Sequence, residues 1–278
     1  MFTYTPHWRG LLDTWTTWLI AADRSPETVR LRRYHLSRLI NDLNTERPHD
    51  VTASDIAAFL ASYPWAPSTR RSYRASIRQF FHWAHTNGHI PTDPTRTLLP
   101  APPPRHIPHP APDDIILQAV LSSPPRTRLM LLLAAEAGLR RAEIARIHIR
   151  NLDATSRNLH ITGKGRRDRV IPISDRLYHA LQDHIHDAHI TGWLFPSPTL
   201  PGPIGAIRVG ELVSEALPSP WTCHSLRHRF ATVTYQTCHD LLLVQQLMGH
   251  AKPETTAGYI ALDTHSAAEV IARISLSP

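Results

Sequence analysis

The stretch from Asn158 to Ile173, which reads NLHITGKGRRDRVIPI, decides the fold class of this chain. Two short segments, residues 158–162 and 169–173, flank the turn Gly163-Lys164-Gly165, and this arrangement predicts a β-hairpin. On both sides of it, apolar residues recur at helical spacing. The sequence therefore predicts a mainly α-helical protein with one small antiparallel β-sheet.

The residues around the hairpin are predicted to form an α+β domain. Gly138 ends a helix that begins near Arg126, and another helical turn starts at Arg140. The helices expected in this half of the chain span residues 113–122, 126–137, 175–187, 204–217, 225–236, 240–248, 253–259 and 266–274.

The first hundred residues are predicted to be helical. Helices are expected near residues 11–22, after the start signal Ser25-Pro26-Glu27, at 50–60, and from Ser68 to Gly88. The last of these has an apolar face formed by Tyr73, Ile77, Phe80, Phe81 and Ala84. A basic stripe is expected on its opposite side and consists of Arg70, Arg71, Arg74 and Arg78.

Seven prolines lie between Pro100 and Pro112. Such a segment is stiff and extended, which makes it the best candidate for a domain boundary. We therefore expect a helical domain over residues 1–100, a proline-rich linker over 101–112, and a second domain with a C-terminal tail over 113–278.

The composition favours a polyanionic partner. The 278 residues include 30 basic and 23 acidic side chains, a formal charge of +7. The longest apolar run, Leu129 to Ala135, is far shorter than the roughly 20 residues of a membrane span, and no leader segment opens the chain. Two cysteines form no disulfide framework, so a reducing cytoplasm is expected. Lysine occurs only at positions 164 and 252, which makes lysine a candidate for releasing a proton near neutral pH, a role that arginine does not fill.

Five motifs occur in a fixed order. They are Ala137-Gly138-Leu139-Arg140-Arg141-Ala142-Glu143-Ile144, the hairpin around Lys164, His224-Ser225-Leu226-Arg227-His228, Leu247-Met248-Gly249-His250, and Tyr259, nine positions after His250. In this order they resemble the first arginine box, the hairpin lysine, the second and third boxes and the nucleophile of the tyrosine recombinases, the phage integrase family. The resemblance covers roughly residues 112–262, and the N-terminal helices fit the family's core-DNA-binding domain more loosely. Ala137 stands where the family usually has threonine.

The resemblance implies a site-specific DNA recombinase that cuts and rejoins DNA through a covalent 3′-phosphotyrosine and a Holliday junction. It implies a SAM-like helical core-DNA-binding domain and an α+β catalytic domain, which clamp the duplex between them, without a further arm-binding domain. The implied partners are double-stranded DNA with an inverted-repeat core site and, on that DNA, a homotetramer; no membrane, cofactor or metal is implied. The implied catalytic residues are Arg140, Lys164, His224, Arg227, His250 and Tyr259.

These residue types suit that chemistry. The phenol of Tyr259 can attack phosphorus, and the guanidinium forks of Arg140 and Arg227 suit phosphate oxygens. His224 lies one helical turn from Arg227, on the same face, where it would bond the phosphate or accept the tyrosine proton. Lys164 is the candidate general acid for the leaving 5′-oxygen.

Other charged residues are expected to act less directly. Glu143 is expected to anchor the arginine box rather than to take part in catalysis. Arg166, Arg167 and Arg169 are expected to be solvated hairpin charges that also touch the DNA backbone. The basic stripe is expected to contact phosphates or the major groove.

The residues support alternative functions to different degrees. A metal-dependent nuclease needs a carboxylate cluster, for which Asp113-Asp114 gives poor support, and a phosphate-cradling loop of the ATPase type is missing from the sequence. A degenerate recombinase that only binds DNA as a regulator, and a strand nicking-closing enzyme of the type IB topoisomerase kind, stay open. The sequence does not decide between phage or plasmid integration and the resolution of chromosome dimers, nor does it give the DNA site.

Overall fold

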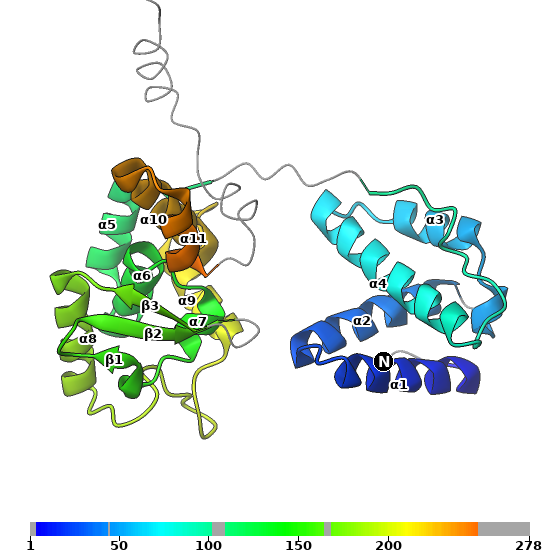
Figure 1. Ribbon diagram of the computed structural model, residues 1–278, viewed down its shortest axis with the longest axis horizontal. Helices are drawn as coiled ribbons and strands as arrows, with labels where there is room; N and C mark the ends of the chain where they lie inside the picture. The colour runs from blue at the N-terminus through cyan, green and yellow to red at the C-terminus, as the bar shows by residue number, and fades with distance from the viewer. Residues whose placement is uncertain (1–3, 44, 102–108, 164–167, 250–278) are drawn as a thin grey trace, which may run out of the picture. The chain divides into compact units, whose positions relative to one another are not determined.

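The computed structural model describes residues 4–43, 45–101, 109–163 and 168–249. The chain divides into two compact units, residues 1–105 and 106–278, and each has its own buried core (Figure 1). The division falls within the proline-rich stretch. The two helices expected at 253–259 and 266–274 lie outside the described residues.

The N-terminal unit is helical, as predicted. Its elements are α1 (Pro6–Ala21), α2 (Pro26–Leu43), the short 3-10 helix η1 (Pro48–Asp50), α3 (Ala53–Ser62) and α4 (Pro67–Thr86). Helices α1, α2 and α4 each begin with a proline, because an N–H in the first turn has no intrahelical acceptor to lose. Thr52 and Asp55 form a capping box that fixes the start of α3.

Helix α2 packs against α1, α3 and α4 around an aromatic core. The rings of Trp15 and Phe80 meet edge to face with their centroids 5.2 Å apart, and every apolar residue predicted for the inner face of α4 is buried. Arg33 of α2 lies at the edge of this core and donates hydrogen bonds to Thr16 and Asp13 of α1.

The C-terminal unit is α+β, as predicted. Its helices are α5 (Asp113–Ser122), α6 (Pro125–Glu136), α7 (Arg141–Ala145), the short 3-10 helix η2 (Ile149–Asn151), α8 (Asp175–Asp187), α9 (Ala206–Ala216), α10 (Cys223–Cys238) and α11 (Leu241–Met248). Its strands are β1 (Leu152–Asp153), β2 (Asn158–Thr162) and β3 (Asp168–Pro172). Among the described residues, no helix is long and apolar enough to cross a membrane.

Helix α6 lies at the centre of this unit (Figure 1). It packs against α5, α7, α8, α9 and α10, and residues 129–135 are all buried. A helix surrounded on every side has no polar face, which explains the apolar run in the sequence.

The sheet has the order β1-β2-β3 and is antiparallel throughout. The predicted hairpin is confirmed as β2 and β3, but the sequence did not predict β1, which pairs with β2. Ile161 of β2 stands opposite Arg169 of β3, and Leu159 stands opposite Ile171. Since directly opposed residues share a face of the sheet, Arg169 is on the face that buries Leu159 and Ile171.

Candidate active site

A glycine turn positions the first arginine motif. Gly138 has a positive φ of 61°, and a Cβ added there would come within 2.3 Å of the Phe230 ring on α10. Both observations require glycine. The turn leads into α7, whose N-cap is Arg140, and the Gly138 carbonyl accepts a hydrogen bond from Arg227.

Helix α10 carries the second motif and begins two residues earlier than predicted. Thr222 caps it in a capping box with Ser225. The two candidate residues of this helix differ in exposure, although they were expected on one face. Arg227 is 1% exposed, whereas His224 is exposed and its ring meets that of His228 with the centroids 4.5 Å apart.

Glu143 joins the arginines of separate motifs. Its carboxylate accepts hydrogen bonds from the backbone N–H of Arg140 at 2.9 Å and from Nη1 of the same residue at 2.9 Å. It also accepts from Nη1 and Nη2 of Arg169, at 3.0 and 2.8 Å. Nη1 of Arg227 lies 3.9 Å from Oε2 of Glu143. We call Glu143, Arg140, Arg169 and Arg227 the arginine cluster.

The end of α11 is the second meeting point of the cluster. The Met248 carbonyl accepts from Nη2 of Arg227 at 2.5 Å and from Nη1 of Arg140 at 3.4 Å. The Leu247 carbonyl accepts from Nε of Arg169 at 2.8 Å. Carbonyls in the last turn of a helix lack intrahelical partners and form its negative end, so the guanidiniums stabilise this helix end.

The surroundings of Glu143 keep it ionised. Burial alone would raise the pKa of Glu143, but the hydrogen bonds and charge of Arg169, the amide of Arg140 and the charge of Arg227 outweigh it. The result is a pKa of about 2, below the ordinary value of 4.5. The expected anchoring role of Glu143 agrees with these contacts.

Arg169 is not the solvated hairpin charge that the sequence led us to expect. Its side chain is only 8% exposed, because its position on β3 directs it to the buried face of the sheet. The alternation of Arg169, Ile171 and Ile173 along this segment is the sequence signal that could have revealed its burial.

Several predicted site residues lie outside the described residues. They are Lys164, Arg166, Arg167, His250 and Tyr259. The described chain reaches Gly163 before the first group and Gly249 before the second. Gly249 ends α11 with a positive φ of 62°, and a Cβ there would lie 2.9 Å from Nη1 of Arg169.

The basic stripe lies on α4 of the N-terminal unit. Arg70 and Arg78 are exposed, while Arg71 and Arg74 are half-buried, so the stripe flanks the buried face rather than opposing it. Nε of Arg74 and Nη1 of Arg32 on the adjacent α2 are buried atoms without a hydrogen-bond partner among the described residues. Arg32 is a half-buried cation on a helix that packs against α4, which makes it a further DNA-contact candidate that sequence reasoning missed.

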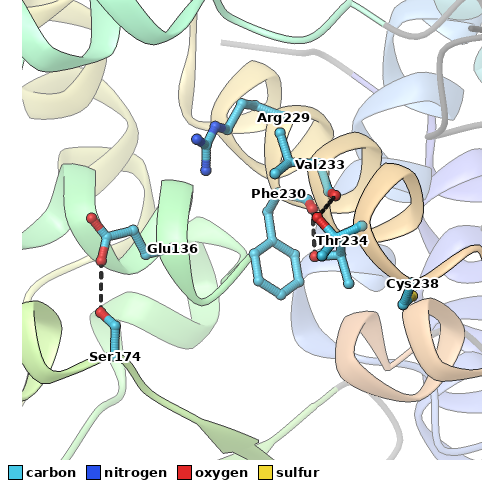
Figure 2. Close-up of a pocket in the computed structure, with 8 residues that line it drawn as sticks. Glu136, Ser174, Arg229, Phe230, Val233, Thr234 and Cys238 are labelled. Atoms are coloured by element: carbon cyan, nitrogen blue, oxygen red, sulfur yellow. Dashed lines mark hydrogen bonds between the residues drawn. The ribbon is translucent and has the colours of Figure 1, made fainter.

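A pocket of about 350 Å³ lies beside α10 (Figure 2). Figure 2 shows Phe230 and Val233 of α10 on one side and Glu136, bonded by the Ser174 hydroxyl, on the other. Its lining includes none of the predicted site residues, so the pocket is separate from the arginine cluster. No group of three side chains suited to a metal ion occurs among the described residues.

The fold and the arginine cluster together define a catalytic domain of the tyrosine recombinase type. The sequence model of the phage integrase family matches residues 114–266, and the chain belongs to that family.

The relatives agree with this assignment. The chain is 28% identical to the tyrosine recombinase XerC of Shewanella amazonensis, over 93% of both chains. It is 30% identical to the tyrosine recombinase XerD of Caulobacter vibrioides, over 87% of this chain and 84% of the relative. The solved structure of a lambda integrase (75–356) dimer bound to a COC′ core site has a TM-score of 0.74 at 21% identity, covering 90% of this chain and 94% of that one. At that identity the likeness shows a shared fold.

Proposed function

We propose that this protein is a site-specific DNA recombinase, which cuts and rejoins DNA strands through a covalent 3′-phosphotyrosine and a Holliday junction. The observation that carries the proposal is the charge of the arginine cluster. Within the part of the chain that the structure describes, three guanidiniums lie around the carboxylate of Glu143, which gives the cluster an excess of positive charge. A phosphodiester that gains negative charge in its transition state is the anion such a site stabilises.

The family supports the same reaction. The relatives XerC and XerD are tyrosine recombinases, and the lambda integrase structure holds a DNA core site. For this chain we propose double-stranded DNA with an inverted-repeat core site as the substrate and a homotetramer as the active assembly. The reaction would take place in the cytoplasm, on the nucleoid, because that is where the DNA substrate lies. Integration of a viral genome is one use of this activity.

The proposed roles follow the chemistry of each side chain. Tyr259 attacks phosphorus, Arg140 and Arg227 stabilise the phosphate, and Lys164 protonates the leaving 5′-oxygen. His224, exposed at the start of α10, and His250 donate to the phosphate or carry the tyrosine proton. No metal or nucleotide takes part in these steps.

We assign DNA binding to the N-terminal unit, as a core-DNA-binding domain, with the basic stripe and Arg32 as its contacts. Arg166 and Arg167 would contact the DNA backbone next to the cleavage site. Neutralising phosphates releases counterions, so binding should weaken steeply with added salt.

The test begins by selecting bound duplexes from a random-sequence pool, which identifies the site. A nicked form of the selected duplex then traps the covalent adduct, which a denaturing gel displays as a slow band. Wild type is expected to give the band in EDTA and without ATP, and Tyr259→Phe is expected to bind the duplex without giving it.

Tyr235→Phe is the matched control, because Tyr235 is a half-buried tyrosine on α10 to which no role is assigned, and it should retain the band. An adduct formed by Tyr259→Phe would refute the assignment of Tyr259 as the nucleophile. No adduct from wild type on any selected duplex would favour the DNA-binding-only alternative. Adducts without exchange between two sites would favour the topoisomerase alternative.

A further inference from the structure

We propose that Arg169 is a positioning residue for this reaction, which holds Glu143 and the end of α11 in the geometry in which Arg140 and Arg227 bind a phosphate. The inference rests on the proposed function and adds a residue to it. Arg169 itself is not expected to touch DNA, since its Nε, Nη1 and Nη2 all donate to acceptors within the protein.

The guanidinium of Arg169 spans two structural elements. Nη1 and Nη2 donate to the two oxygens of Glu143, at 3.0 and 2.8 Å, and Nε donates to the Leu247 carbonyl at 2.8 Å. Three donors of one rigid plane therefore fix the carboxylate relative to the last turn of α11. Arg169 follows Asp168, which pairs with Thr162 across the hairpin, so the same contacts also tie the sheet to the arginine cluster.

Both partners of Arg169 hold the phosphate-binding arginines in turn. The Glu143 oxygens that accept from Arg169 also accept from the backbone and side chain of Arg140. The Met248 carbonyl, next to that of Leu247, accepts from Arg140 and Arg227. A shift of Arg169 therefore moves both arginines, and a displacement of about 1 Å at a catalytic group costs on the order of 100-fold in rate.

Lysine does not reproduce this arrangement. An ammonium group is a point donor on a flexible stem, whereas the guanidinium is a planar fork that bonds a carboxylate through two parallel N–H groups. Arg169→Lys keeps a cation next to Glu143 and so avoids an unpaired buried charge, but it loses the rigid connection to α11. The lysine variant therefore tests the bonding geometry of Arg169 separately from its positive charge.

The experiment measures single-turnover cleavage of the nicked selected duplex at saturating protein, together with its Kd. The rate constant reports the geometry of the site, and the amplitude reports the fraction of folded, active protein. For Arg169→Gln we expect the rate constant to fall about 100-fold, and for Arg169→Lys about 10-fold or more. Both variants should keep their amplitude and a Kd within about threefold of wild type, because no phosphate contact is lost.

The matched control is Arg208→Gln. Arg208 pairs with Glu211 and Glu215 on the surface, with its side chain 50% exposed, and its loss should leave the rate constant unchanged. A residue needed only for stability would lower the amplitude and the melting temperature without changing the rate constant.

The outcomes separate the two proposals. If wild type and Arg208→Gln cleave and either Arg169 variant cleaves at the wild-type rate, the positioning role is refuted and the proposed function stands. If neither Arg169 variant folds, the residue is a requirement of the fold, and the inference is also refuted. If wild type forms no adduct, the proposed function fails and this inference fails with it.

Discussion

Glu143→Gln is expected to destabilise the C-terminal unit strongly, although it changes only one oxygen to an amide nitrogen. The Glu143 side chain is 5% exposed, and its carboxylate accepts hydrogen bonds from Arg140 and Arg169 on both of its oxygens. A glutamine has one acceptor oxygen, and its NH₂ group would face guanidinium donors. Arg169 and Arg227, with side chains 8% and 1% exposed, would lose their anion.

Two lines of reasoning give the same magnitude. Removing one partner of a buried ion pair costs about 3–5 kcal/mol. The pKa of Glu143, lowered from 4.5 to about 2, corresponds to about 3 kcal/mol of stabilisation at neutral pH at about 1.4 kcal/mol per unit. We therefore expect the free energy of unfolding of this unit to fall by about 3 kcal/mol.

Hydrogen exchange measured by mass spectrometry on peptides from α6 and α10 is the appropriate assay, because it reports the opening of this unit separately from the N-terminal one. Glu211→Gln is the control, since Glu211 forms an exposed pair with Arg208 at 3.1 Å and such pairs contribute about 1 kcal/mol or less. If the two substitutions have equal effects, Glu143 does not hold the arginine cluster together.

Other consequences can be tested with the same protein. Because the pKa of Glu143 is lower in the folded protein, the stability that its ionised carboxylate gives to the fold is complete above pH 4.5 and is lost as the pH falls toward 2. In Glu143→Gln, the free energy of unfolding should therefore fall less steeply over that pH range. Lys164→Arg should keep the positive charge but lose most of the cleavage activity, because arginine does not release a proton at neutral pH. A substrate with sulfur as the bridging 5′-atom needs no acid, so it should restore cleavage to Lys164→Ala but not to Arg140→Ala. Equal restoration of both would exclude Lys164 as the acid. Deletion of residues 264–278 should abolish strand exchange in a two-site assay while half-site binding continues, since we expect this apolar tail to dock on a neighbouring subunit; full exchange would disprove the docking.

The elements that the sequence predicted best are those with local signals. Helices α5 and α8 have the predicted bounds, Asp113–Ser122 and Asp175–Asp187, because their apolar spacing and the acidic residues of their first turns are local to the segment. Strand β1, Leu152–Asp153, has two residues, too few for any period to show. It exists because β2 offers an edge for it to pair with, and that edge is present only in the folded unit.

Of the contacts within the candidate site, the sequence predicted that Glu143 anchors the arginine box and missed that it also binds Arg169. Motif order pointed to Arg140 and Arg227, but the pairing of Arg169 with Glu143 spans 26 positions and leaves no local pattern. A basic residue in a hairpin is most often solvated, and that general preference led to the wrong expectation for Arg169. In the structure, Arg169 instead follows the two-residue alternation of β3 and lies on the same face of the sheet as buried Ile171.

The exposure of the three guanidiniums indicates how the site meets DNA. The side chains of Arg227 and Arg169 are 1% and 8% exposed and are held by backbone carbonyls, whereas the side chain of Arg140 is 35% exposed. Buried cations at such short range need an anion to remain together, and Glu143 supplies it before any DNA arrives. One carboxylate does not neutralise three guanidiniums, and Arg140 is the most exposed of the three, so in the proposed function it is the member of the cluster expected to meet the DNA phosphate first. Glu143 therefore holds the arginines in place and neutralises only part of their positive charge.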